Sequence, residues 1–249
     1  MKLSANCYTV RDLIAKDLWG TLAALRGLGL DYIEIGGLYG VSAKEFREGV
    51  DKLGLKISAN HVALDQLENQ MDQVIEDNRI LGVQCIVLPW IDKQFYERGW
   101  AMAAKKLEPF GARLRDEGFI FAYHNHSFEF EPENGRPGLD VFYEAADPHL
   151  VGAQIDTYWV AYGGGDTAAY IRKLEGRVTQ CHFKDGKIGG SEPHFLEVGQ
   201  GDLNWDDIIA ACHESDVKFV SIELDECPHE PIESVRMSAE FLRGKGITE

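Results

Sequence analysis

Eight strand-like apolar runs alternate with eight helical patterns along this chain of 249 residues. The first units show the alternation: an apolar run over 2–8, a helical spacing of leucines over 11–28, and a second apolar run over 32–37. Such alternation is typical of a parallel sheet covered by helices. About 250 residues is the usual length of a closed (β/α)8 barrel, whereas open doubly wound sheets use fewer strands. The sequence therefore predicts an α/β fold, a (β/α)8 TIM barrel forming a single domain over 1–249.

The remaining predicted elements continue the alternation of strands and helices. Further strands are predicted at 55–64, 84–90, 119–126, 150–156, 178–185 and 219–225. Further helices are predicted at 42–53, 65–81, 93–116, 138–146, 166–174, 204–215 and 231–243. The glycine-rich stretch 185–204 is expected to be a long loop.

The composition of the chain excludes some classes of binding partner and indicates the cellular compartment. The chain has 25 basic and 41 acidic residues, a net charge of −16, which repels phosphate backbones and anionic membranes. We therefore expect neither nucleic acid nor a membrane as a partner. Five cysteines without CxxC spacing indicate free thiols in a reducing compartment. Without a signal-like start or a run of about 18 apolar residues, the expected location is the cytoplasm.

Polar side chains stand at the ends of four strands in the second half of the chain. They are His124, His126 and Glu129, then Asp156, then His182 with Lys184 and Asp185, then Glu223 with Asp225. The carboxyl ends of barrel strands meet on one face, where these barrels keep their chemistry. Mixed carboxylate and imidazole donors suit a divalent ion such as Mn²⁺, Mg²⁺, Co²⁺ or Zn²⁺.

Each of these residues also has a structural explanation. Asp156 can cap the turn that follows its strand, and a single strand histidine such as His182 is more often a hydrogen-bonded core residue. Glu223, between two apolar residues, must be buried, which a carboxylate tolerates when it is paired or bound to a metal. The recurrence of such residues at the same end of consecutive strands favours a site.

Five residues are candidates for binding substrate. His61 ends another strand, and His126 shares a strand face with His124. Trp90 and Trp159 follow strand ends and are placed to form an apolar wall for a sugar ring. Glu34 either contacts substrate or pairs with a core cation. With no GxSxG elbow and no GxGxxG fingerprint, acyl transfer and dinucleotide chemistry are disfavoured.

The motifs that carry most information resemble the sugar phosphate isomerase/epimerase family of the xylose-isomerase-like barrel superfamily. They are YHNHSFEF (123–130), IDTYWV (155–160), HFKD (182–185), VGQGDLNW (198–205) and IELD (222–225). The resemblance implies a metal site with Asp156, His182 and Glu223 as ligands. Many relatives have a glutamate where this chain has His124. Glu129, in the following loop, is the predicted fourth ligand, with His124 as the alternative.

The resemblance also implies a reaction. It predicts an isomerase or epimerase that acts on a sugar or keto-sugar through an enediolate, with Glu223 as base and His124 as proton donor. Lys184 is expected to stabilise the developing oxyanion. Because His124 replaces a glutamate, a lyase or dehydratase acting on an inosose or 3-keto-glycoside is the alternative. An endonuclease IV-like nuclease and a non-catalytic sugar-binding barrel are less favoured. The expected partner is a small sugar or cyclitol, and the oligomeric state stays open.

Overall fold

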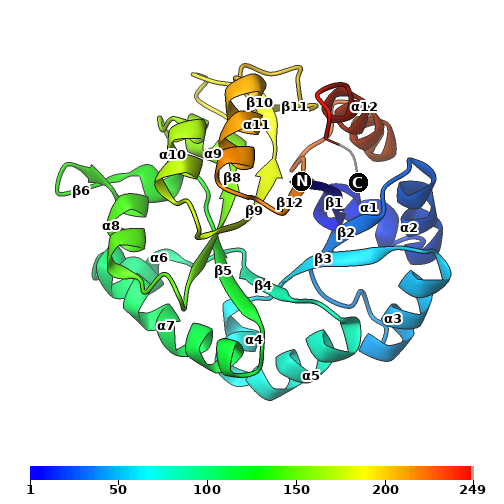
Figure 1. Cartoon of the computed structure of the whole chain (residues 1–249), viewed down its shortest axis with the longest axis horizontal. Coiled ribbons are helices and arrows are strands. Elements are labelled where there is room, and N and C mark those ends of the chain that lie inside the picture. Colours follow the sequence, from blue (N-terminus) through cyan, green and yellow to red (C-terminus); the bar gives the residue numbers. More distant parts are fainter. Residues whose placement is uncertain (248–249) are drawn as a thin grey trace.

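Eight parallel strands close into a barrel, seen along its short dimension in Figure 1. The computed structural model describes residues 1–247. The strands follow one another around the barrel in chain order, and the first pairs with the last. They are β1 (Lys2–Asn6), β2 (Tyr32–Ile35), β3 (Lys56–His61), β4 (Cys85–Leu88), β5 (Ile120–His124), β8 (Gly152–Asp156), β9 (Val178–Phe183) and β12 (Phe219–Ile222). The predicted (β/α)8 barrel is confirmed.

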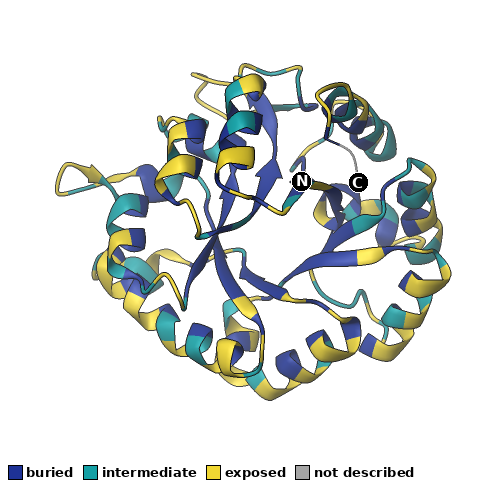
Figure 2. Ribbon diagram, viewed as in Figure 1, coloured by how far each residue is buried: buried dark blue, intermediate teal, exposed yellow. Residues whose placement is uncertain are grey.

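Helices surround the barrel, with their inner sides buried against the strands and their outer sides exposed (Figure 2). They are α1 (Arg11–Ile14), α2 (Leu18–Gly27), α3 (Ala43–Lys52), α4 (Leu64–Asn69), α5 (Met71–Leu81), α6 (Lys93–Tyr96), α7 (Trp100–Asp116), α8 (Gly138–Ala145), α9 (Thr157–Tyr162), α10 (Thr167–Lys173), α11 (Trp205–Glu214) and α12 (Pro231–Gly244). Two 3-10 turns, η1 (Cys7–Val10) and η2 (Phe128–Phe130), follow β1 and β5. None of the helices within 1–247 is long and apolar enough to cross a membrane.

Three of the predicted helices are interrupted. Asp17 has an extended backbone and accepts the Gly20 N–H, so a new helix starts within the predicted 11–28. Gln70, at φ −136°, divides α4 from α5. Gly99 divides α6 from α7 with a φ of 102°, a conformation that favours glycine. Apolar spacing does not reveal these breaks, because it reports which face is buried rather than whether the backbone is continuous.

Two stretches predicted as loops contain short antiparallel hairpins. β10 (Asp185–Lys187) pairs with β11 (His194–Leu196) inside the long loop, and β6 (Pro132–Glu133) pairs with β7 (Arg136–Pro137). Asp185 holds the long loop together, because its carboxylate accepts the Gly199 N–H at 2.9 Å and the Trp205 Nε1–H at 2.7 Å. Its position after β9 therefore serves the loop rather than the group of residues at the strand ends.

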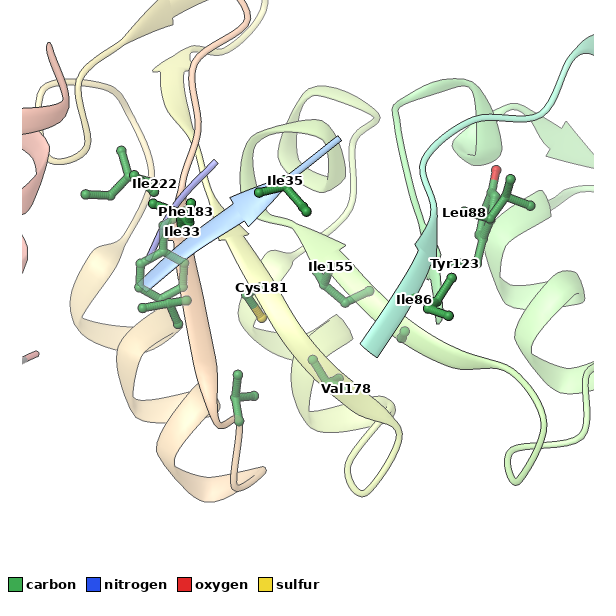
Figure 3. Close-up of a cluster of buried hydrophobic side chains, with 14 of the residues drawn as sticks. Ile33, Ile35, Ile86, Leu88, Tyr123, Ile155, Val178, Cys181, Phe183 and Ile222 are labelled. Atoms are coloured by element: carbon green, nitrogen blue, oxygen red, sulfur yellow. The ribbon is translucent and has the colours of Figure 1, made fainter. Parts of the chain in front are cut away.

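The main core lies between the strands and the helices. Ile155, Cys181 and Phe183 point outward from the barrel and belong to the buried cluster in Figure 3. Phe183 packs on Trp205 of α11 with ring centroids 4.9 Å apart. Because side chains alternate along a strand, their neighbours point into the lumen. The five cysteines form no disulfide within the described residues, in line with the predicted free thiols.

Candidate metal and substrate site

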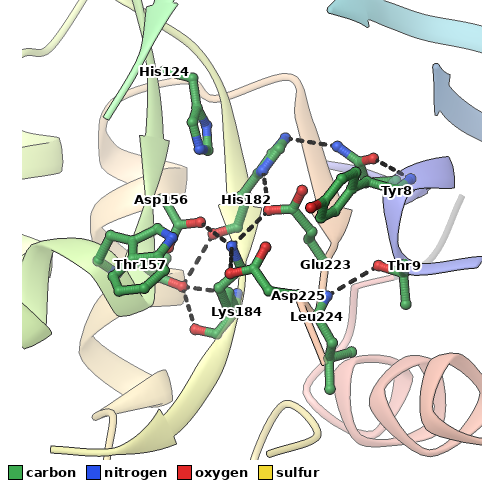
Figure 4. Close-up of polar contacts among 12 residues, drawn as sticks. Tyr8, Thr9, His124, Asp156, Thr157, His182, Lys184, Glu223, Leu224 and Asp225 are labelled. Atoms are coloured by element: carbon green, nitrogen blue, oxygen red, sulfur yellow. Dashed lines mark hydrogen bonds and ion pairs between the residues drawn. The ribbon is translucent and has the colours of Figure 1, made fainter. Parts of the chain in front are cut away.

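Four side chains meet at the carboxyl end of the barrel. His124 and Asp156 are the last residues of β5 and β8, His182 lies near the end of β9, and Glu223 directly follows β12. One potential ligand atom from each lies within 4.8 Å of those from the other three. All four are buried, and Figure 4 shows them facing one another. The strand register brings them together, because Asp156 is the register partner of His182 on the neighbouring strand.

The His182 ring is held between two carboxylates. Its Nδ1 lies 2.7 Å from Glu223 Oε2, and its Nε2 lies 2.9 Å from Glu34 Oε2. Burial alone would lower the pKa of His182, but the two carboxylates outweigh it and raise that pKa well above its usual value. Both ring nitrogens therefore carry protons when no metal is bound, and a metal that binds one of them must displace its proton.

A second layer of polar groups fixes the state of His124. Gln154 donates from Nε2 to Glu34 Oε1 at 2.7 Å, so its Oε1 is the acceptor for His124 Nδ1 at 3.0 Å and for His61 Nε2 at 2.8 Å. His124 must therefore carry its proton on Nδ1 when neutral. Burial, aided by the neighbouring His182 ring, lowers the pKa of His124 well below its usual value. A neutral ring protonated at Nδ1 leaves the Nε2 lone pair available to a cation.

Lys184 neutralises the carboxylates of the site. Its buried Nζ lies 3.0 Å from Asp156 Oδ2, 2.9 Å from Glu223 Oε2 and 2.9 Å from Asp225 Oδ2. Burial would lower the pKa of Lys184, but the three carboxylates hold it well above its usual value. His182 and the same ammonium together hold the pKa of Glu223 well below its usual value despite burial. Glu223 is therefore ionised at neutral pH.

The residues present fit a divalent metal ion. Two imidazoles and two carboxylates converge, and Asp156 Oδ1 accepts the Trp159 N–H while its buried Oδ2 faces the Lys184 ammonium at 3.0 Å. Mixed nitrogen and oxygen donors of this kind suit zinc and manganese. Lys184 Nζ lies beside the same carboxylates, so an incoming ion would compete with it for them.

The predicted fourth ligand, Glu129, has a different environment. It is fully buried, accepts hydrogen bonds from Tyr123 Oη at 2.6 Å and from the His126 N–H at 2.9 Å, and does not belong to the group of four. Burial raises the pKa of Glu129 to about 7 although both hydrogen bonds favour its charged form. The geometry thus groups His124, the alternative ligand, with the other three residues.

A cavity of about 260 Å³ opens beside the four residues. It is lined by Tyr8, His61, Pro89, Trp90, His124, His126, Lys184, Glu223 and Asp225. Trp90 is half exposed and packs edge-on against the His126 ring at 4.9 Å, so its ring is a wall of the cavity. His126 Nδ1 is buried and has no partner among the described residues.

Two of the predicted substrate-binding residues do not line this cavity. Trp159 lies behind it, with a buried Nε1 and with its ring centroid 5.4 Å from Lys184 Nζ. Glu34 is fully buried beneath it, between the His61 and His182 rings. Its position suits the orientation of these rings rather than contact with substrate.

Sequence reasoning missed two residues of the site. Gln154 precedes Asp156 by two positions in β8, so the two-residue period of a strand already indicates that it shares the inward face. Tyr8 follows β1 and is half exposed at the cavity, and its position depends on the 3-10 turn η1 that the sequence pattern did not predict.

Comparisons with known proteins agree with the barrel fold. A family model described as "Xylose isomerase-like TIM barrel" matches residues 22–245. An inosose dehydratase of Lactiplantibacillus plantarum is 23% identical over 239 residues, covering 87% of this chain and 77% of the relative.

Two solved structures share the fold over nearly the whole chain. A sugar phosphate isomerase/epimerase from Parabacteroides distasonis superposes with a TM-score of 0.82 at 22% identity, covering 100% of this chain and 95% of that one. The IolI protein, solved with a bound zinc atom, has a TM-score of 0.73 at 18% identity and covers 98% and 97% of the two chains. With its family model matched over most of its length, this chain belongs to the xylose isomerase-like TIM barrel family.

Proposed function

We propose that this protein is a divalent-metal-dependent isomerase or epimerase that removes a proton from the carbon next to the carbonyl of a keto-sugar or cyclitol. The observation that carries the proposal is the meeting of four ligand-type side chains beside a cavity at the carboxyl end of the barrel. The names of an inosose dehydratase relative and a sugar isomerase/epimerase neighbour support a substrate of this class.

His124, Asp156, His182 and Glu223 are the proposed ligands, with His124 in the place first predicted for Glu129. The neutral His124 ring, protonated at Nδ1, offers the Nε2 lone pair that a ligand needs. When bound, a divalent ion supplies Lewis-acid polarisation of the substrate carbonyl. The zinc atom in the IolI structure supports such an ion, and Mn²⁺ is the ion we propose to test first.

Glu223 is the proposed general base. It lines the cavity and is held ionised by His182 and Lys184. A base must reach the proton that it removes, and the edge of the cavity gives it that access. Lys184 places a buried positive charge beside the same cavity, where it would stabilise the negative oxygen of an enediolate.

The proton donor is proposed from the remaining N–H groups of the cavity. If His124 Nε2 binds the ion, that atom cannot also donate a proton. His124 as a ligand would therefore not be the proton donor that the sequence predicted. His126 and Lys184 both line the cavity and carry N–H groups. His61 and Trp90, on the same lining, are proposed to contact the substrate ring.

Elimination of water or an alkoxide from the same enediolate is the second candidate function. A two-base epimerase places carboxylates on both faces of the substrate, and here His124 ends the strand that would supply one of them. The curated relatives named inosose dehydratase also support this outcome. Isomerisation returns the proton to carbon, whereas elimination expels an oxygen substituent, so the products differ.

Proton exchange tests the proposal. The metal-loaded protein is incubated in D₂O with keto-sugars, inososes and 3-keto-glycosides, and NMR follows deuterium uptake and new vinylic signals. We expect turnover with uptake at the carbon next to the carbonyl in wild type, its loss in Glu223→Gln, and its retention in the exposed control Glu226→Gln. Vinylic products would identify elimination. Turnover without exchange, equal in both variants, would refute the enediolate.

A further inference from the structure

A second cavity opens at the opposite, amino-terminal end of the barrel. It has a volume of about 590 Å³, more than twice that of the cavity beside Glu223, and its size is within the range of small-molecule sites. The first residues of seven barrel strands line it: Lys2, Tyr32, Lys56, Cys85, Ile120, Val178 and Phe219. The chemistry of these barrels takes place at the other end, so this cavity is separate from the site described above.

The cavity exists because the inward side chains at this end are small. Barrel interiors are usually filled by bulky branched residues. Here Ser4 and Ser58 face each other with their hydroxyl oxygens 3.0 Å apart, and Cys85 stands at the start of the next strand. Ser58 and Cys85 line the cavity directly. The lumen is therefore open to solvent at the amino-terminal end of the barrel.

The lining is positively charged in a chain of net charge −16. It contains the basic residues Lys2, Arg47, Lys56, Arg177 and Lys218, against one carboxylate, Asp216. Arg47 and Lys218 are paired with carboxylates, and Arg177 donates to three backbone carbonyls.

Lys2 and Lys56 differ from the other cations of the lining. Neither has a carboxylate within 4.0 Å among residues 1–247. Their ammonium groups both lie over the Tyr32 ring, at 5.1 and 5.5 Å from its centroid, and Lys2 also lies 5.4 Å from the centroid of Phe219. Two uncompensated positive charges thus converge on one aromatic wall.

Gln180 supplies an unpaired donor in the wall of the cavity. It is 1% exposed, it lines the cavity, and its Nε2 has no hydrogen-bond partner among the described residues. A buried amide without a partner is costly and is normally satisfied by another group or by a ligand. Its inward direction follows from the strand period, because His182, two residues later on β9, also points inward.

We propose that this cavity is a binding site for a small organic anion with an apolar body, either a phosphate monoester or a carboxylic acid. The anionic group would lie between Lys2 and Lys56, the apolar body against Tyr32 and Phe219, and an acceptor oxygen would take the free N–H of Gln180. The two lysines attract the negative charge, and the rings provide apolar contact area. The hydrogen bond from the Gln180 amide fixes the orientation of the ligand. The site does not depend on the proposed reaction.

The test is calorimetric titration of the metal-loaded protein with phenyl phosphate at low ionic strength, with neutral phenol as the uncharged comparison. We expect saturable one-site binding of phenyl phosphate and at least 10-fold weaker binding of phenol. The double variant Lys2→Ala/Lys56→Ala should weaken phenyl phosphate at least 10-fold. The control Lys44→Ala/Lys52→Ala removes two exposed lysines from α3 and should bind like wild type.

The variant Gln180→Leu distinguishes a ligand-binding role of Gln180 from a purely structural one. It removes the unpaired amide, so we expect a higher melting temperature without ligand together with weaker binding of phenyl phosphate. Lower stability with unchanged binding would overturn the role of Gln180. No saturable binding, or binding that is lost in Trp90→Ala at the other end of the barrel and retained in the Lys2/Lys56 variant, would overturn the site.

Discussion

Replacing Glu129 by glutamine tests how strongly burial acts on a carboxylate beside the proposed metal site. Glu129 is fully buried, and its pKa is raised from 4.5 to about 7, chiefly by burial, against the hydrogen bonds from Tyr123 and the His126 N–H. Glutamine has nearly the same shape but no charge. The variant therefore removes the titration while it keeps the volume of the side chain.

The sign and the size of the effect follow from proton linkage. Between pH 4.5 and about 7 the folded protein binds more protons at Glu129 than the unfolded chain does, so stability falls as the pH rises through this window and then levels off. One pKa unit corresponds to about 1.4 kcal/mol, so the rise of the pKa from 4.5 to about 7 gives a total loss of about 3.5 kcal/mol, as an order of magnitude.

Urea unfolding, followed by tryptophan fluorescence with a chelator present, measures this loss at pH 5 and pH 8. Because part of the loss lies below pH 5, we expect the unfolding free energy of wild type to fall by about 2.5 kcal/mol more than that of Glu129→Gln over this interval. The exposed control Glu68→Gln should retain the full wild-type fall. Parallel pH profiles of wild type and Glu129→Gln would refute the argument that burial dominates at this residue.

Four further outcomes are expected. Asp156→Asn and Glu223→Gln should each lower Mn²⁺ affinity at least about 10- to 100-fold, and unchanged calorimetric binding would remove them from the ligand set. Glu34→Gln should weaken the same affinity by roughly 10- to 100-fold because it releases a ligand imidazole, whereas the exposed Glu45→Gln should not. Trp90→Ala should raise KM and leave metal affinity intact. An unchanged KM would show that the Trp90 ring packs against its neighbours without contacting substrate. Duplex DNA should not bind at physiological salt, as a gel-shift titration would show, because the charge is −16.

The barrel could be predicted because its signals are local. A two-residue period in the strands and a helical spacing between them repeat eight times, and both come from burial of one face of each element. The interruptions at Asp17, Gln70 and Gly99 could not be predicted in the same way, because apolar spacing continues across a break. The hairpins in the loops depend on contacts such as those of Asp185 with Gly199 and Trp205, which are set by the folded loop.

The main part of the proposed metal site could also be predicted. Asp156, His182 and Glu223 stand at strand ends, and parallel strands bring their carboxyl ends together whatever the loops do. The fourth position could not be settled from the chain. The choice between His124 and Glu129 depends on whether the loop after β5 turns its carboxylate toward the other ligands or, as here, toward Tyr123.

The sequence by itself determined the class of fold, the end of the barrel that carries the proposed chemistry, and the ionisable residues gathered there, because these depend on strand period and chain direction. Only the tertiary structure decided the states of those residues. Glu34 and His182 are 148 positions apart in the chain, yet their contact, together with that of Glu223, raises the pKa of the His182 ring. The cavity at the other end likewise comes from small side chains on separate strands that become neighbours only when the barrel closes.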